Sequence, residues 1–396
     1  MSNTWKIYVL ALVSFLVGTS EYVIAGILDR ISDTMNISLI AAGQLITIFS
    51  LVYALGTPII IALTSRMDRR KLLLYFLGLF VIGNVLAFLL PGYGLFIAAR
   101  VLMALGAGVV VVTSLTIAAK IAAVGKQASS IATVITGFTA SLIVGVPLGR
   151  MVAAAWDWKL VFAGIAILGV IAMIVIAITI PPSEGEAPVP LKKQLALLKQ
   201  PRIGLALLVS FFWLGGYSIA YTYISPYLVS IAGMSEALLS SALLAFGIAS
   251  LIGSKSGGYS ADRMGVKRTL LMGMALHVIS LLMLNVTAHS GAAVFIVLIL
   301  WSFSAWSSGP TQQYNLVTMA PESSGIMLSL NSSVMQLAMA AGAGIGGIAV
   351  SAVSLSSITW IGAVGVVIAM MIIILAYVRE LPLRLRPNLP MWHDGL

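Results

Sequence analysis

Twelve long apolar runs fill most of the chain, and each is long enough to cross a lipid bilayer. A hydrocarbon core of about 30 Å needs roughly 20 apolar residues in helical conformation. On that measure we expect spans at residues 6–28, 41–64, 72–90, 94–119, 129–154, 160–180, 203–231, 237–258, 269–288, 292–318, 325–352 and 357–378. Charged residues make up only 9% of the 396 residues, against about 25% in soluble domains. The sequence therefore predicts an all-α integral membrane protein with twelve transmembrane helices.

The composition also excludes several classes of function. The chain has no cysteine, and its three histidines show no ligand spacing, so we expect no disulfide and no metal site. The net charge of +10 comes from short basic clusters between apolar runs rather than from a basic arm, which argues against a nucleic-acid partner. No nucleophile–base pair suggests an enzyme, so no catalytic residue is predicted. No phosphate-binding Gly-x-x-x-x-Gly-Lys-Ser/Thr loop is present, so energy must come from an ion gradient, without a cofactor.

Lysine and arginine are distributed unevenly between the two sides of the predicted spans. Of the 22 basic residues, eighteen flank one side and four (Arg30, Arg100, Arg150 and Lys159) flank the other. Cytoplasmic loops carry the excess of Lys and Arg, so we expect a multi-pass protein of the cell (cytoplasmic) membrane with both termini cytoplasmic.

One connection is much longer than the others and is rich in Pro and charge. It divides the chain into an N-terminal six-helix bundle (1–180), a cytoplasmic linker (181–202), a C-terminal six-helix bundle (203–380) and a cytoplasmic tail (381–396). The two halves repeat a basic loop after their second span, at 64–71 and at 258–268. Internal repeats of this kind are common in secondary transporters, whose substrate site lies between the repeats.

One acidic residue lies deep within a predicted span. Glu21 sits in the middle of the first apolar run, in the stretch Gly18-Thr19-Ser20-Glu21-Tyr22-Val23. A carboxyl group at bilayer depth is costly and usually marks an ion, proton or substrate path. Glu21 is therefore the main candidate proton carrier, and the alternative is a structural carboxyl bonded to a neighbouring span.

Three stretches resemble the major facilitator superfamily, and within it the twelve-helix drug:proton antiporters. They are the loop Gly258-x-x-x-Asp262-Arg263-x-Gly265, the span-5 series Gly145-Val146-Pro147-Leu148-Gly149, and Thr19-Ser20-Glu21-Tyr22-Val23. The nearest branch looks like the bacterial sugar, nucleoside and multidrug efflux permeases. The resemblance implies the major facilitator fold, with two pseudo-symmetric six-helix bundles. In the N-terminal loop the usual Asp is replaced by Ser65.

The resemblance also implies roles for individual residues. Proton coupling would involve Glu21 and Arg100, and the antiporter motif would be Gly145, Pro147 and Gly149. A cytoplasmic loop latch would comprise Gly258, Asp262, Arg263 and Gly265 in one half and Arg66, Arg69 and Arg70 in the other. Substrate contacts would come from Tyr22, Trp213, Tyr217, Tyr221, Trp301, Gln312 and Asn331.

The sequence thus predicts a proton-coupled antiporter that exports drugs or other amphipathic compounds. We expect it to act as a monomer in the bilayer, with a small molecule and protons as its partners. An exporter dedicated to a sugar or a purine nucleoside is the first alternative, and a proton symporter or a non-transporting membrane receptor is the second. Arg100 could instead reach the membrane interface, the loop arginines could only set topology, and the aromatic residues could only pack.

Overall fold

The computed structural model describes residues 3–123, 127–183, 197, 199–320 and 324–384, and within these ranges it is helical with no strand. The α-helices and the single π-helical segment, η1, are α1 (Asn3–Gly26), α2 (Leu28–Met35), α3 (Leu39–Leu63), α4 (Arg69–Leu89), α5 (Tyr93–Ile121), α6 (Gln127–Ala140), η1 (Ser141–Gly145), α7 (Val146–Ala155), α8 (Lys159–Thr179), α10 (Pro201–Thr222), α11 (Ile224–Ser230), α12 (Glu236–Met264), α13 (Val266–Thr287), α14 (Gly291–Met319), α15 (Ser324–Ala352) and α16 (Ser357–Arg384). Among the described residues, twelve helical stretches are long and apolar enough to cross a membrane, which confirms the predicted fold class.

Several helices begin where a short polar side chain accepts a hydrogen bond from the first turn. Ser38 and Asp68 accept from Ala41 N and Lys71 N at the starts of α3 and α4. Ser235 and Ser290 cap α12 and α14 in the same way. Such caps satisfy N–H groups that a helix leaves unbonded at its beginning. The apolar runs are therefore bounded by polar signals that fix where each helix enters.

The first predicted span, 6–28, ends at Gly26, close to its predicted end, and is followed by the short helix α2. The seventh predicted span, 203–231, is broken, because α10 ends at Thr222 and α11 follows. This break has a local cause: Pro226 has no N–H to donate to the carbonyl oxygen of Thr222, and its ring would clash with that carbonyl group in a continuous helix. The fifth span contains η1 just before Pro147, so the helical register changes within the predicted antiporter motif.

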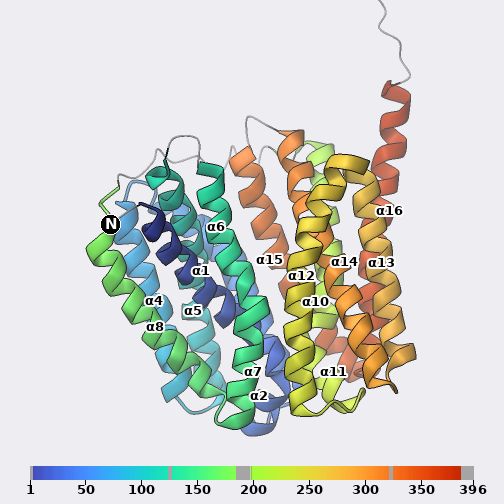
Figure 1. Ribbon diagram of the computed structural model, residues 1–396, viewed down its shortest axis with the longest axis horizontal. Coiled ribbons are helices and arrows are strands. Elements are labelled where there is room, and N and C mark those ends of the chain that lie inside the picture. Colours follow the sequence, from blue (N-terminus) through green and yellow to red (C-terminus); the bar gives the residue numbers. More distant parts are fainter. Residues whose placement is uncertain (1–2, 124–126, 184–196, 198, 321–323, 385–396) are drawn as a thin grey trace, which may run out of the picture.

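The helices of the two chain halves form two groups that lie side by side (Figure 1). Within the first group α4 packs on α5 and α8, and α1 packs on α6. Within the second, α10 packs on α15 and α16, and α14 packs on α12 and α13. We call the end where α1 begins the near end, and the end that holds α2, α7 and α11 the far end (Figure 1).

The two groups meet along two seams. One joins α3 to α15, and the other joins α12 to η1 and α7. At the second seam the backbones almost touch, because a Cβ added to Gly247 would lie 2.4 Å from the Cα of Ile143. This contact joins α12 to η1, in the middle of the fifth span.

Parts of the predicted organisation lie outside the described residues. They include most of the linker 181–202, residues 385–396 of the tail, and the basic residues Lys126, Lys192, Lys193 and Arg386. The domain boundaries stay a prediction.

Candidate functional site

Glu21 lies buried where α1 of the first half meets α15 of the second. Its side chain is only 3% exposed, and its Oε1 accepts a hydrogen bond of 3.0 Å from Gln336 Nε2. The other carboxyl oxygen, Oε2, has no hydrogen-bond partner among the described residues. A buried polar atom without a partner is uncommon, so Oε2 is an acceptor whose hydrogen-bonding capacity no described residue uses.

Arg100 is fully buried close to Glu21, with no part of its side chain at the protein surface. Its Nη1 donates to the carbonyl oxygen of Ser20 at 2.7 Å, and its guanidinium carbon lies 4.1 Å from the centre of the Phe49 ring. Glu21 and Arg100 interact electrostatically, although no described contact joins them as an ion pair. The structure therefore places the two residues predicted for proton coupling at one buried site.

The predicted antiporter motif packs directly against the part of α1 that carries Glu21. A Cβ added to Gly145 would lie 2.2 Å from Thr19 Oγ1, and one added to Gly149 would lie 2.2 Å from Val23 Cγ2. These contacts lie two residues before and two residues after Glu21. Small residues at such positions let helices approach closely. The motif thus forms a tight seam on which the position of Glu21 depends.

A cleft lies on the near-end side of the seam between α12 and η1. It encloses about 720 Å³ of empty space, including its open mouth. One wall comes from α6 and η1 and the facing walls come from the second half. The lining residues are Ile135, Thr139, Ile143, Trp213, Leu214, Tyr217, Ser250, Leu251, Ser254, Ala305, Trp306, Gly309, Pro310, Gln313 and Met335.

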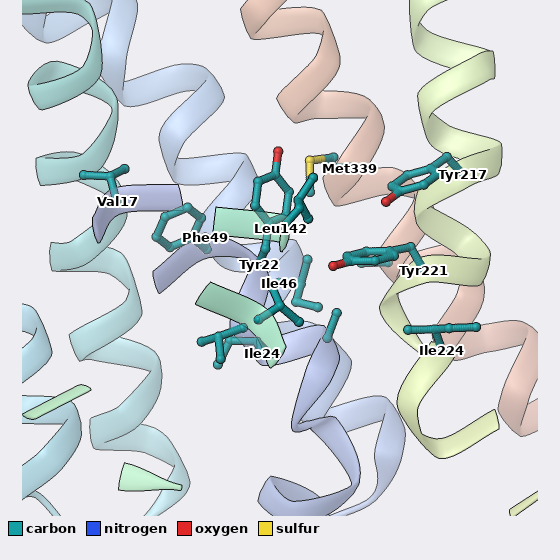
Figure 2. Close-up of a cluster of buried hydrophobic side chains, with 14 of the residues drawn as sticks. Val17, Tyr22, Ile24, Ile46, Phe49, Leu142, Tyr217, Tyr221, Ile224 and Met339 are labelled. Atoms are coloured by element: carbon teal, nitrogen blue, oxygen red, sulfur yellow. The ribbon is translucent and has the colours of Figure 1, made fainter. Parts of the chain in front are cut away.

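Stacked aromatic rings extend from the cleft toward Glu21. The rings of Tyr217 and Tyr221 are stacked with their centres 5.0 Å apart, and Tyr221 meets the edge of Tyr22, which follows Glu21 in the chain. Figure 2 shows the two α10 tyrosines pointing toward Tyr22 of α1. The ring of Trp301 packs on that of Tyr217, with their centres 5.6 Å apart, and its Nε1–H donates to His277 Nε2 at 2.8 Å. Four of the predicted contact residues are therefore joined in one aromatic wall.

The remaining predicted contact residues are placed differently. Trp213 lines the cleft, and its indole N–H is buried without a partner among the described residues. Gln312 donates to the carbonyl of Ala206 and to Ser210 Oγ, so its amide N–H groups are engaged with α10. Asn331 is 2% exposed and donates to Met335 Sδ on its own helix. The cleft-lining amide is Gln313, which follows Gln312 in the chain.

The two predicted latch loops differ at the near end. In the first half Asp68 accepts from Ser183 N at 2.6 Å, and Arg70 donates to the carbonyl of Ala177, so this loop is tied to the end of α8. Arg69 is buried, and the side chain of Arg66 is exposed. The loop arginines of this half are thus not equivalent.

In the second half the signature loop turns tightly at Gly265, which has a positive φ of 83°. Asp262 is exposed and has no described hydrogen bond or ion pair, and Arg263 lies over the ring of Tyr259 on its own helix. Gly258 belongs to α12, and nothing described lies within 4 Å of a Cβ added there. In this arrangement the loop makes no described link to a neighbouring helix through Asp262.

A cluster of charged residues joins the two halves at the far end. Arg150 of α7 is fully buried; its Nη1 donates to Asp29 Oδ1 at 2.5 Å, and its Nε donates to Glu236 Oε2 at 2.9 Å. Arg30 also binds Glu236, and Ser225 donates to Asp29 at 2.8 Å. Asp29, Arg30 and Arg150 belong to the first half, whereas Ser225 and Glu236 belong to the second. We refer to these five residues as the far-end cluster.

The sequence predicted neither the far-end cluster nor the contact of Gln336 with Glu21. A usable signal was present for the cluster, because Arg150 follows the span-5 motif inside a helix and a buried arginine needs a carboxylate partner. Asp29 and Glu236 stand at ends of spans on the same side. No comparable local signal links Gln336 to Glu21, which lies 315 positions away in the chain.

Comparisons with known proteins agree with this architecture. The family model "Major Facilitator Superfamily" matches residues 10–343 and 257–390. The chain is 65% identical over 377 residues to the MFS-type transporter YbcL of Bacillus subtilis (strain 168), covering 95% of this chain and 97% of that one. It is 31% identical over 352 residues to the inner membrane transport protein YdhP of Escherichia coli (strain K12), covering 89% and 90% of the two chains.

A solved structure shares the same fold. It is a bacterial homolog of the human lysosomal transporter Spinster in an inward-facing and unoccupied conformation, with a TM-score of 0.75, 16% sequence identity and coverage of 96% and 98% of the two chains. Twelve membrane-spanning helices, the matching family model and relatives that are transporters lead to one conclusion. The chain belongs to the Major Facilitator Superfamily, as a multi-pass membrane transporter and not an enzyme.

Proposed function

We propose that this transporter exports a small amphipathic molecule in exchange for protons. The observation that carries the proposal is the buried carboxyl group of Glu21, which lies between the halves with one oxygen bonded to Gln336 and the other unpartnered. A carboxyl at this depth that faces the interior of a helix bundle is typical of a proton path. Arg100 beside it supplies a fixed positive charge that the ionised form can face.

The near end is proposed to be the cytoplasmic end, because it carries the basic loops. On this orientation the cleft between α6 and α12 opens toward the cytoplasm, and the far-end cluster closes the outer side. The unengaged loop at Asp262 fits a state in which the cytoplasmic side is open. The arrangement therefore corresponds to an inward-open step of an alternating-access cycle.

The cycle then follows from the positions of Glu21 and the cleft. With the cleft open to the cytoplasm, Glu21 releases its proton and substrate binds against Tyr217 and Trp213. The halves rock, the far-end cluster separates, and substrate leaves to the outside. A proton that enters from the outside returns Glu21 to its neutral form and allows the far end to close again.

The proton gradient is sufficient for this work. One charge moving through 100 mV supplies about 2.3 kcal/mol, and each pH unit adds about 1.4 kcal/mol. Because about 1.4 kcal/mol corresponds to a tenfold ratio, one proton could sustain roughly a hundredfold to thousandfold gradient of a neutral substrate. No cofactor is required.

The cleft suggests what kind of molecule is carried. The rings of Trp213, Tyr217 and Trp306 suit a flat apolar compound, and aromatic faces also attract cations. The amide of Gln313 and the hydroxyl of Ser250 add hydrogen-bonding groups to the same cleft. This polar edge supports the second candidate, an exporter dedicated to a sugar or purine nucleoside.

The test is proton release from acidified everted membrane vesicles that contain the transporter. Adding an exported compound should release protons from the lumen, whereas an uptake symporter or a silent receptor should give no release. The variant Glu21→Gln should abolish the signal while remaining in the membrane, and Asp33→Asn, an exposed carboxyl on α2, serves as the matched control. Export against a gradient by Glu21→Gln would show that another group carries the proton.

A further inference from the structure

Three polar atoms at the Glu21 site are buried and lack hydrogen-bond partners among the described residues. They are Glu21 Oε2, Gln336 Oε1 and Arg100 Nη2. Two of them are acceptors and one is a donor. Because buried polar atoms are nearly always paired, this set indicates that the site is built for more than one hydrogen-bonding arrangement.

The first arrangement joins Glu21 to Gln336. The amide N–H of Gln336 already donates to Glu21 Oε1 at 3.0 Å. Each side chain then has one acceptor oxygen left, Oε2 of Glu21 and Oε1 of Gln336, and each of these oxygens is attached to the same Cδ atom as the group already bonded. Two acceptors cannot bind each other, but a proton on Glu21 Oε2 would supply the missing donor. Protonated Glu21 and Gln336 can therefore form two parallel hydrogen bonds across the two halves.

The second arrangement joins Glu21 to Arg100. The guanidinium is held in place by the carbonyl of Ser20 and by the ring of Phe49, and its Nη2 is left free to donate. An ionised carboxylate accepts a charge-assisted hydrogen bond of this kind more strongly than it accepts one from a neutral amide. A rotation of the Glu21 side chain would exchange the bond to Gln336 for an ion pair with Arg100.

We propose that Glu21 changes its partner with its proton: protonated Glu21 binds Gln336 of α15 in the opposite half, and ionised Glu21 binds Arg100 of α5 in its own half. This inference rests on the proposed function, since it explains how proton binding at Glu21 moves the helices. Gln336 is then a positioning residue for coupling. Proton binding strengthens the contact between Glu21 and Gln336, which forms when the far end is closed. Protonation therefore favours closure of the far end, as the proposed exchange of protons for exported substrate requires.

Few other ionisable groups surround Glu21. Tyr53 of α3 and the adjacent Tyr22 interact with it, and Tyr221 of α10 meets Tyr22. The helices α6 and η1 contain no ionisable residue, and the only one on α7, Arg150, is bound to Asp29 and Glu236. Of the other helices packed on α1, α8 carries only Lys159, at its far-end start, and α11 carries only Tyr227, which donates to Asn285. Besides Arg100, α5 carries Tyr93 and Lys120 in its first and last turns. The partner exchange thus involves one acid, one base and one amide.

The experiment uses the full-length protein, whose sequence has no cysteine to interfere with labelling. Spin labels at Thr34→Cys and Val353→Cys report the distance between the halves at the far end, and labels at Ala123→Cys and Met319→Cys report the near end; all four side chains are exposed. Distances are measured in nanodiscs without substrate between about pH 5 and about pH 9. We expect the fraction with a closed far end to rise as the pH falls.

Gln336→Met removes the amide at nearly constant size, and it should reduce this pH-dependent change at least fivefold. Gln44→Met, an amide on α3 without a described hydrogen bond, is the matched control and should behave like the unmodified protein. Gln336→Glu is a second variant that keeps a polar partner. Because two carboxyl groups can share one proton, its transition should move to higher pH by about one unit or more.

The outcomes separate the two proposals. A full pH response in Gln336→Met, or an unmoved transition in Gln336→Glu, would overturn the partner exchange and leave Glu21 as a candidate proton carrier. A full response in Glu21→Gln would show that Glu21 is not the titrating group, and the proposed proton site would fail with it. A response that Glu21→Gln abolishes and Gln336→Met flattens supports both.

Discussion

The far-end cluster gives the sharpest prediction about how the outer side is closed. Arg150→Gln keeps a polar side chain but removes the charge that joins Asp29 of one half to Glu236 of the other. Breaking a buried ion pair by removing one partner costs about 3–5 kcal/mol. Here the carboxylates left behind are partly hydrated, because the side chain of Asp29 is 14% exposed and that of Glu236 is 42% exposed.

The cost should therefore be smaller than for a fully buried pair, and about 1–3 kcal/mol is a reasonable range. Since the cluster forms only when the halves meet at the far end, this cost falls on the closed state. About 1.4 kcal/mol changes an equilibrium constant tenfold, so the ratio of closed to open far ends should fall by about five- to 140-fold.

The assay is the far-end distance between labels at Thr34→Cys and Val353→Cys, measured with and without Arg150→Gln at one pH. Lys159→Gln is the matched control, because it removes a positive charge at the same end, and the described contact of that charge is with the ring of the adjacent Trp158. If both variants gave the same far-end distances, the cluster would be a local feature of α7 and not a closure between the halves.

Two further predictions concern the seam and the buried arginine. Gly145→Ala should destabilise the protein by about 1–3 kcal/mol through overpacking, since the new Cβ would meet Thr19 Oγ1 at 2.2 Å. Thermal unfolding in detergent measures this change, and Gly164→Ala is the control because its new Cβ would have nothing within 4 Å. Equal melting temperatures for the two variants would contradict a tight seam. Arg100→Gln should impair proton-coupled export far more than Arg66→Gln, because Arg100 is buried beside Glu21 and Arg66 is exposed. Transport assays in vesicles test this, and equally mild losses of export in the two variants would refute a coupling role for Arg100.

The membrane topology could be predicted from the sequence because it depends on local composition. Each span is a long apolar run with polar caps or short basic loops at its ends, and these signals do not depend on distant residues. The breaks inside spans were harder to predict. Pro226 explains the end of α10 once the structure is known, but a proline can also lie within one continuous helix, as Pro310 does in α14.

The candidate site was predictable only in part. Glu21 stands out because its cost in an apolar run is visible from the sequence alone. Its partner Gln336 does not stand out, because an amide in a helix is inexpensive and many amides occur in the chain. Gln312 was predicted to contact substrate because it is polar, but its amide N–H groups donate to α10, and it is its neighbour Gln313 that lines the cleft. Which side a residue faces is set by tertiary packing, which periodicity in a uniformly apolar helix does not encode.

The two polar contacts between the halves are connected through one part of the chain. Glu21 and Asp29 are eight residues apart, on either side of the break between α1 and α2, and the fifth span touches both regions through Gly145 and Arg150. A shift of α1 against the second half would therefore strain the Glu21–Gln336 bond and the far-end cluster together. Buried charges contribute little net stability when they are paired, but they make partial separation costly. Such a pair of contacts favours either a fully closed or a fully separated far end, and this two-state behaviour is what alternating access requires.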